Sequence, residues 1–171
     1  MEARKAQDSF TTMNELVLPN DTNTFGDLMG GKLMYWMDIA AYFSAAKHCN
    51  SACMTASVDN LSFKSSIKLG NVICIEAIVS RAFSTSMEIH LKVWNQNMIT
   101  QSRELSNEAF FTFVALDENK KPKKVPEIIP ETEEQIKLFD GALRRRQLRL
   151  VLSGKMNPHE ATELKAYFTE A

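Results

Sequence analysis

One long apolar segment, rich in small side chains, constrains the fold of this chain more than any other part of its sequence. Across residues 32–47, apolar and small side chains recur at spacings of three and four, which predicts a helix with one buried face. Met37, Ala40, Ala41 and Ser44 fall on this face. Because small side chains allow close approach, we expect this helix to lie directly against a sheet.

The segments that follow the helix have the composition of β-strands. Four such segments are predicted: residues 53–63, 71–81, 85–94 and 109–116. Residues 85–94 alternate between apolar and polar side chains, which is typical of a strand with one face in water. Residues 109–116 are apolar on both faces, which predicts an interior strand. The polar residues 95–107 between them are predicted to form a hairpin loop, and residues 8–18 form a weaker strand pattern.

Residues 117–130 separate the strands from a second predicted helix. Three prolines and four lysines in this stretch predict a solvated connector. Thr132 is a candidate N-cap for the helix, and residues 156–171 are predicted to form a further short helix or a loose tail. A long helix before an antiparallel meander is typical of an α+β fold in which the sheet wraps the helix. We therefore expect one domain over residues 1–130 and a C-terminal helical extension over residues 131–171.

Composition and charge narrow the class of protein and its partners. The formal net charge of −1 gives no support for binding to nucleic acid or to a membrane surface. Cys49, Cys53 and Cys74 match no CxxC pair or zinc-binding pattern, so we expect bystander thiols in a reducing compartment and no metal site. Nothing in the sequence indicates a redox cofactor. The charged residues 1–7, and the lack of an apolar run of about 20 residues, predict a soluble cytoplasmic protein.

Two glycines at the start of the predicted helix have the features of an anion-binding site. The first turn of a helix carries backbone N–H groups without internal partners, and the helix dipole adds partial positive charge there. Gly30 and Gly31 leave room for a ligand carbonyl to approach those donors. This is the construction of an oxyanion hole.

Asp38 is an acidic residue within this otherwise apolar helix, next to Met37 and Ile39. An unpaired carboxylate among apolar residues is costly, so Asp38 is a functional candidate; a carboxylate on the solvent face is the alternative. Asp38 follows Gly31 by seven residues, which is about 10 Å along a helix. A carbonyl bound at Gly31 is therefore out of reach of the same chain's Asp38. We expect a composite site across a subunit interface.

The spacing of five residues in this region resembles the signature of a known enzyme family. Asn23, Gly26, Gly30, Gly31 and Asp38 match, at every spacing, the signature of the hotdog-fold cytosolic acyl-CoA hydrolases of the brain-type and bacterial hexameric class. The resemblance covers about residues 14–135 and continues in order through Thr55, residues 59–63, Gly70, residues 85–87, residues 111–114 and residues 125–126. It implies a hotdog fold, in which an antiparallel sheet wraps one long central helix, and hydrolysis of fatty acyl-CoA to free fatty acid and CoA.

The resemblance also implies roles for these residues. The aspartate at the position of Asp38 acts as general base or nucleophile on the thioester, and backbone amides near Gly30 and Gly31 polarise its carbonyl. The asparagine at the position of Asn23 comes from the neighbouring subunit and orients the attacking water or the carbonyl. A homodimer is implied as the catalytic unit, and a homohexamer, a trimer of dimers, as the assembly. Coenzyme A enters only as part of the acyl-CoA substrate, and no cofactor is implied.

The residues implied to hold coenzyme A match the family less completely. Thr85 and Ser86 match a Thr-Ser segment that helps to hold CoA or the backbone of the site. The family often has Gly-Arg before this segment, whereas residues 83–84 are Phe-Ser here, which removes a potential phosphate contact. Arg81 and Lys64 are the candidates to replace it.

Two other functions remain open from the sequence. A hotdog hydratase or dehydratase normally needs a histidine that works with an acid, and the central helix has none before His48. A non-catalytic acyl-CoA-binding module is the second alternative. His90 is expected on a wet strand face, and residues 144–146, all arginine, on a solvated helix face or in a phosphate or subunit contact. Three apolar residues are candidates to line the acyl channel: Met34, Met37 and Phe63.

Overall fold

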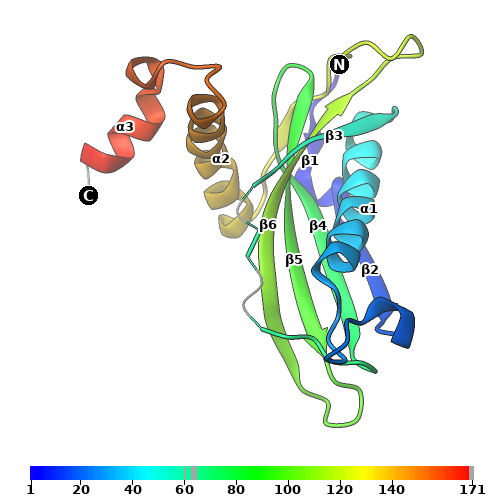
Figure 1. Cartoon of the computed structure of the whole chain (residues 1–171). Helices are drawn as coiled ribbons and strands as arrows, with labels where there is room; N and C mark the ends of the chain where they lie inside the picture. Colours follow the sequence, from blue (N-terminus) through cyan, green and yellow to red (C-terminus); the bar gives the residue numbers. More distant parts are fainter. Residues whose placement is uncertain (60, 63–64, 170–171) are drawn as a thin grey trace.

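The computed structural model describes residues 1–59, 61–62 and 65–169 of the 171-residue chain. A five-stranded antiparallel sheet, in the order β2-β4-β5-β6-β3, curves around one long helix (Figure 1). These elements are α1 (Gly30–Cys49), β2 (Thr11–Leu16), β3 (Cys53–Asp59), β4 (Val72–Ala82), β5 (Ser86–Gln96) and β6 (Arg103–Ala115). Two helices follow, α2 (Glu133–Leu152) and α3 (Thr162–Thr169). The predicted α+β arrangement, with a sheet around one long helix and a helical C-terminus, is confirmed.

α1 packs against one face of the sheet through the small residues that the sequence singled out. Met37, Ala40, Ala41 and Ser44 are all fully buried, so the predicted buried face is confirmed. The helix contacts every strand of the five-stranded sheet. It ends at Asn50, whose φ of 50° is the left-handed conformation common after a helix C-terminus. α1 therefore forms the centre of the hydrophobic core.

The hairpin between β5 and β6 is longer than the sequence indicated. Its turn covers only residues 97–102, so the prediction of a loop over residues 95–107 is wrong. Polar side chains at this end of the sheet bind one another across the strands, and Asn95 Nδ2 donates to Glu104 Oε1 at 3.0 Å. Polar residues that pair across strands look like loop residues in a hydropathy pattern, although they stabilise the strands.

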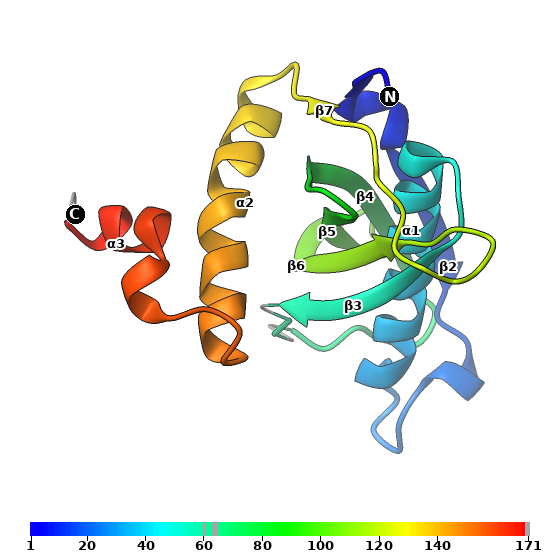
Figure 2. The ribbon, with the colours of Figure 1, turned by 90° about the horizontal axis from the view of Figure 1, so that it is seen from above.

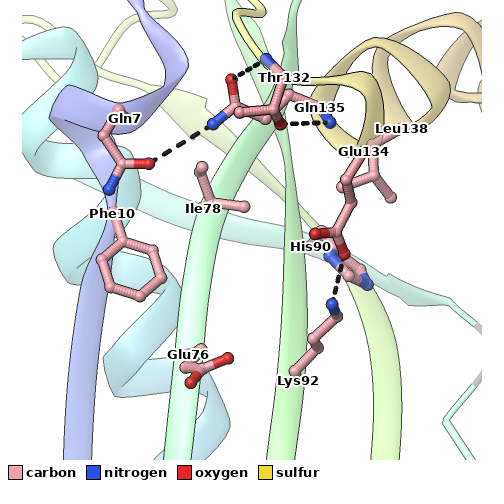
Figure 3. A pocket seen from close by; sticks show the side chains of 10 residues that line it. All are labelled: Gln7, Phe10, Glu76, Ile78, His90, Lys92, Thr132, Glu134, Gln135 and Leu138. Carbon is pink, nitrogen blue, oxygen red and sulfur yellow. Dashed lines mark hydrogen bonds and ion pairs between the residues drawn. The ribbon is translucent and has the colours of Figure 1, made fainter.

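The polar face of β5 is covered by α2 instead of water. α1 and α2 lie on opposite sides of the sheet (Figure 2). Glu88 and His90, on the face toward α2, are 0% and 5% exposed, so the prediction of a strand with one wet face is wrong. A period of two shows only that the faces differ in polarity. Here the polar face of β5 meets polar residues of α2, as Figure 3 shows for Lys92 and Glu134.

The arginine cluster of α2 makes its contacts within the chain. Each arginine has its own partner: Arg144 lies over the Tyr167 ring, Arg145 pairs with Glu88, Arg146 lies over the Phe83 ring, and Arg149 pairs with Asp59. These contacts replace the solvated helix face that the sequence predicted. They hold α2 on the sheet and α3 on α2.

We expect Arg145→Leu to lower the free energy of unfolding by about 3–5 kcal/mol, because it removes one partner of a buried ion pair. Arg145 Nε and Nη2 donate to the two carboxylate oxygens of Glu88 at 3.0 and 2.7 Å, and Glu88 is fully buried. Without the guanidinium, the hydroxyl of Ser80, 2.6 Å away, is the one side-chain donor left to this carboxylate in the described part of the chain. Thermal unfolding at a fixed protein concentration should show a fall in Tm of about 10 °C.

Arg144→Leu is the matched control for this substitution. Arg144 contacts the ring of Tyr167, which is more than half exposed, so its loss should cost less than about 1 kcal/mol. The double variant Arg145→Leu/Glu88→Leu removes both charges and should recover most of the lost stability. Equal destabilisation by Arg144→Leu and Arg145→Leu would contradict a specific role for the buried pair.

The C-terminal helices begin and end close to the predicted positions. Thr132 Oγ1 accepts a hydrogen bond from Gln135 N at 3.2 Å, and Gln135 Oε1 accepts from Thr132 N at 3.3 Å, so Thr132 is the N-cap. Of the two alternatives for residues 156–171, the short helix is confirmed by α3. The domain boundary at residue 130 stays a prediction. Among the helices that the structure describes, none is long and apolar enough to cross a membrane.

The N-terminus and the connector form a small sheet that the sequence did not indicate. β1 (Arg4–Lys5) and β7 (Ile128–Ile129) pair in parallel. Two-residue strands are too short to show a periodicity, which is why hydropathy could not identify them. The pairing fixes the connector next to the C-terminal end of α1, where Arg4 Nη1 donates to the carbonyl of His48 at 2.7 Å.

Candidate active site

The loop before α1 folds around the side chain of Asn23. Its Oδ1 accepts hydrogen bonds from Phe25 N at 2.9 Å and from Asp27 N at 3.2 Å. Both bonds use the carbonyl end of the amide, which fixes the orientation of the side chain. The Nδ2 group has no acceptor among the described residues, and Asn23 is exposed. Asn23 can therefore donate hydrogen bonds to a ligand without giving up its place in the loop.

Two ion pairs attach this loop to its neighbours, one at the start of α1 and one at Lys68 before β4. Asp21 is 7% exposed, accepts a hydrogen bond from Leu18 N at 3.0 Å and pairs with Lys32 Nζ at 3.2 Å. Lys32 belongs to the first turn of α1. A second ion pair joins Asp27 to Lys68. The loop is thus held on both sides, which keeps Asn23 in a constant position relative to the helix N-terminus.

The start of α1 offers backbone donors in an open cavity. Helix α1 begins at Gly30 without a side-chain cap, and the first intrahelical bonds come from residues after Gly31. A Cβ added at Gly31 would meet nothing within 4 Å, so a ligand atom has room to approach. A cavity of about 360 Å³ lies beside this turn, and both Asn23 and Gly30 line it. The structure therefore places Asn23 and Gly30 beside one cavity, and the role of Asn23 and the glycine amides as donors stays a prediction.

Asp38 is neither unpaired nor fully buried, contrary to the expectation from its neighbours. It is half-buried, and Thr55 Oγ1 donates to its Oδ1 at 2.6 Å. Thr55 lies on β3, which crosses α1 at this point. The hydrogen bond fixes the carboxylate and leaves Oδ2 for a second proton or a reacting atom. The sequence matched Thr55 to the family without giving it a role; only the packing of β3 on α1 shows its partner.

Within one chain, the aspartate and the donors lie apart. α1 continues without a break from Gly31 to Asp38, so the separation of about 10 Å along the helix holds in the structure. Among the described residues, Asp38 does not line the cavity beside Asn23. The expectation that one chain cannot bring both groups to one carbonyl therefore stands.

Strand register places Asp38 near the turn between β4 and β5. Thr55 pairs with Phe113 of β6, and Phe113 pairs with Met87 of β5. Met87 lies at the start of β5, directly after the turn at residues 83–85. The Asp38–Thr55 pair is thus two strand spacings, or about 10 Å, from this turn. The Asn23 loop lies at the other end of β4, where two backbone hydrogen bonds hold it. Leu28 N donates to the carbonyl of Ile67, and Leu69 N donates to the carbonyl of Gly26. β4 itself is roughly 30 Å long, whereas Asp38 lies about 10 Å along α1 from Gly31.

The residues predicted to bind coenzyme A have different surroundings. Thr85 and Ser86 belong to the β4–β5 turn, which the bond from Phe83 N to Ser86 O closes at 2.8 Å. Arg81 Nη1 donates to Phe139 O at 2.9 Å, and its guanidinium lies over the ring of Phe139, so Arg81 is committed to α2. Lys64 lies outside the described residues.

The predicted lining of an acyl channel is only partly accessible. Met37 is fully buried in the core, whereas Met34 is 39% exposed on α1. Phe63, the third candidate, lies outside the described residues. His48, the nearest histidine to the helix centre, is 1% exposed, and its Nε2 lies 2.9 Å from the carbonyl of Pro126. Burial lowers the pKa of His48. This histidine is therefore part of the core and does not face Asp38.

Comparison with known proteins gives consistent matches. The Thioesterase superfamily model matches residues 25–101. A Bacillus subtilis protein described as an uncharacterized acyl-CoA thioester hydrolase is 41% identical, over 86% of this chain and 86% of its own length. Mouse acyl-coenzyme A thioesterase 11 is 40% identical over 81% of this chain, which spans only 23% of the mouse protein.

Solved structures agree with the fold and bear on the site. A crystal structure of an apo-hexameric acyl-CoA thioesterase has a TM-score of 0.87 and 40% identity, and the match covers 90% of this chain and 98% of that one. An acyl-CoA hydrolase from Staphylococcus aureus, solved with butyryl-CoA, CoA and CoA disulfide, has a TM-score of 0.81 and 33% identity over 88% of this chain and 94% of that one.

The Staphylococcus aureus enzyme has also been solved with one Asn, one Asp and one Thr replaced singly by alanine. That Asn and Asp are 15 positions apart, and the Thr follows the Asp by 17 positions. Asn23, Asp38 and Thr55 have the same separations in this chain. The three side chains that the geometry singles out therefore coincide in spacing with those chosen for substitution in that enzyme.

Proposed function

The chain belongs to the thioesterase superfamily, among the hotdog-fold acyl-CoA hydrolases, and on this basis we propose that it hydrolyses acyl-CoA thioesters to a carboxylic acid and free coenzyme A. The observation that carries the site assignment is the hydrogen bond from Thr55 to Asp38, between two residues whose spacing also occurs in the substituted enzyme. A hydratase or dehydratase would need a histidine that works with this carboxylate, and His48, in the last turn of the same helix, is buried against the carbonyl of Pro126.

Asp38 is the group that starts the reaction. The Thr55 hydroxyl occupies Oδ1, so the carboxylate cannot rotate freely and Oδ2 keeps a constant direction. In this position Oδ2 can take a proton from an attacking water or attack the thioester carbon itself. A single turnover in ¹⁸O-labelled water separates these mechanisms. Label in the Asp38 carboxylate indicates direct attack, and label only in the product acid indicates activated water.

The negative charge that develops on the thioester oxygen needs donors, and these come from the Asn23 end of the chain. The amides of Gly30 and Gly31 point out of the helix N-terminus, where the dipole adds positive charge. Asn23 Nδ2 adds a side-chain donor held by its own loop. Such preorganised donors stabilise an oxyanion more than water does, because they do not need to reorient during the reaction.

A second copy of the chain completes this site. Among the residues that the structure describes, β3 pairs only with β6, which leaves its other edge without backbone partners. Met54 and Val58 on this strand are 54% and 37% exposed. An exposed edge strand with apolar side chains is suited to pair with its own copy across a twofold axis. Such a dimer reverses the second chain, which brings its Asn23 end toward the Asp38 end of the first. A hexamer built as a trimer of dimers is the proposed assembly.

Coenzyme A is held as substrate, and no metal or cofactor is part of the proposal. The β4–β5 turn with Thr85 and Ser86 lies near Asp38, which suits a contact with the CoA part of the thioester. Arg81 is not included, because its guanidinium already contacts Phe139. We propose that the enzyme works in the cytoplasm on fatty acyl groups. The channel for the acyl chain begins beside the exposed Met34.

Release of free thiol from a panel of acyl-CoAs tests the function. We expect release from at least one chain length between acetyl and palmitoyl, with one carboxylic acid formed for each thiol. An enoyl-CoA should lose its thioester and not gain water across its double bond. Hydration without thiol release would favour a hydratase, and tight binding of every acyl-CoA without turnover would favour a binding module. Either outcome, with the protein folded and oligomeric, would overturn the proposal.

A further inference from the structure

Two of the three cysteines lie in contact, although the sequence predicted bystander thiols. The Sγ atoms of Cys49 and Cys53 are 3.1 Å apart. Cys49 ends α1 and Cys53 begins β3, and the short link between them turns at Asn50. A disulfide needs sulfur atoms about 2.05 Å apart, so a shift of about 1 Å would allow the bond. We propose that Cys49 and Cys53 are a reversible modification site, a dithiol that peroxides oxidise to an intrachain disulfide.

The two thiols differ in reactivity, and Cys49 is the nucleophile. The thiol of Cys53 and the hydroxyl of Ser51, 3.4 Å away, can both donate to the Sγ of Cys49. The hydrogen bond from Cys53 is the main cause that lowers the pKa of Cys49 to about 6, against the opposing effect of burial. The same hydrogen bond, together with burial, raises the pKa of Cys53. Because a thiolate and not a thiol attacks peroxide, Cys49 reacts first.

Positive charge and an open cavity surround Cys49. A helix C-terminus normally disfavours a thiolate, because its carbonyl groups carry partial negative charge. Here Arg4 Nη1 donates to the carbonyls of Lys47 and His48 at 3.0 and 2.7 Å, which offsets that charge. A cavity of about 300 Å³, which Arg4, Cys49 and Lys123 line, lies beside this residue, although Cys49 itself is only 5% exposed.

The reaction balances with one peroxide for each pair of thiols. The Cys49 thiolate attacks one oxygen of hydrogen peroxide, the O–O bond breaks, and the released hydroxide takes up a proton to become water. Cys49 now carries a sulfenic acid in place of the thiolate that accepted the hydrogen bond from Cys53. The Cys53 sulfur attacks the Cys49 sulfur, the S–O bond of the sulfenic acid breaks, and the hydroxide that leaves takes the Cys53 proton to become a second water. Two thiols are oxidised and one peroxide is reduced.

Cys74 gives the chain an internal control. It lies on β4, and burial raises the pKa of its thiol, whereas the hydrogen bond from Cys53 lowers the pKa of Cys49. It should therefore react slowly with peroxide and keep its thiol while the pair is oxidised. The chain contains no other cysteine.

Thiol counting and peptide mass test this site independently of any thioesterase activity. The folded protein is treated with a small excess of hydrogen peroxide, then denatured, and its free thiols are titrated. We expect the count to fall from three to one per chain and to return to three after dithiothreitol. Trypsin releases residues 48–64 as one peptide that holds both cysteines, because no lysine or arginine lies between its ends. Without reduction, this peptide should be lighter by two hydrogen atoms.

Single variants separate the pair from other oxidation. Cys74→Ser should fall from two thiols to none, whereas Cys49→Ser should keep close to two, since Cys53 has no partner to join. Circular dichroism checks that each variant is folded. The proposal is overturned if the folded wild type keeps three thiols, or if Cys74 is lost as readily as the pair. It is equally overturned if the product is a cross-link between chains on a non-reducing gel.

Discussion

Asp38→Asn is expected to lower kcat for thioester hydrolysis by on the order of 10³-fold, with KM changed less than about threefold. Asparagine has the shape of aspartate, and its side-chain oxygen can still accept the hydrogen bond from Thr55 Oγ1, 2.6 Å from Asp38 Oδ1 in the native chain. The variant loses only the charge and the second lone-pair site, which are what a base or nucleophile needs. Thiol release at saturating acyl-CoA measures the effect.

Two further variants show whether the loss is specific. Asp140→Asn neutralises an exposed aspartate of α2 and should leave kcat within about twofold of wild type. Thr55→Val removes the hydroxyl that fixes Asp38 and should lower kcat by about tenfold, while Thr55→Ser should retain most of it. Turnover by Asp38→Asn above a tenth of the wild-type rate would rule out Asp38 as base or nucleophile.

The helix that carries Asp38 could be predicted from the sequence because its signals are local. The periodicity of α1, the glycines at its start and the N-cap at Thr132 each lie within a few residues of the feature they determine. A helix is stabilised by bonds between neighbours along the chain, so its pattern appears in any short window. The succession of strands along the chain followed from the same kind of pattern, whereas their order in the sheet, with β3 beside β6, did not.

The contact that orients Asp38 and the contact that holds α2 on the sheet could not be predicted, because each joins residues that are far apart along the chain. The bond from Thr55 to Asp38 depends on how β3 crosses α1. The pairing of Arg145 with Glu88 depends on where α2 lands on the sheet, and it turned a face that looked solvated into a buried one. Hydropathy shows that a strand face is polar, but whether water or a charged helix covers it depends on the tertiary structure.

Asn23→Asp is expected to lower kcat/KM by on the order of 10²-fold while leaving the fold intact. The new carboxylate can still accept the hydrogen bonds from Phe25 N and Asp27 N that Oδ1 accepts at 2.9 and 3.2 Å. It replaces the Nδ2 donor by a negatively charged oxygen, next to the place where negative charge develops on the thioester. An aspartate therefore repels the transition state that the asparagine stabilises.

Asn97→Asp is the matched control for this substitution. Asn97 Oδ1 accepts from Ile99 N at 2.9 Å and from Thr100 N at 3.0 Å, so it organises the β5–β6 turn as Asn23 organises its loop. It should keep kcat/KM within about twofold, because Asn97 is not among the residues that line the cavity beside Asn23 and its replacement removes no donor to the substrate. Equal losses in both variants would show that damage to a turn, and not loss of a donor, explains the Asn23 result.

Mixing two inactive chains tests whether the site spans two subunits. Asp38→Asn and Asn23→Asp chains, co-expressed in equal amounts, assort at random, so about half of the dimers contain one of each. If Asp38 and Asn23 come from different chains, each mixed dimer holds one site with both native residues and one site with neither. The mixture should then regain about a quarter of the wild-type activity per chain, well above either variant alone. If both residues came from the same chain, no mixed dimer would hold an intact site, and the activity would stay at the average of the two variants.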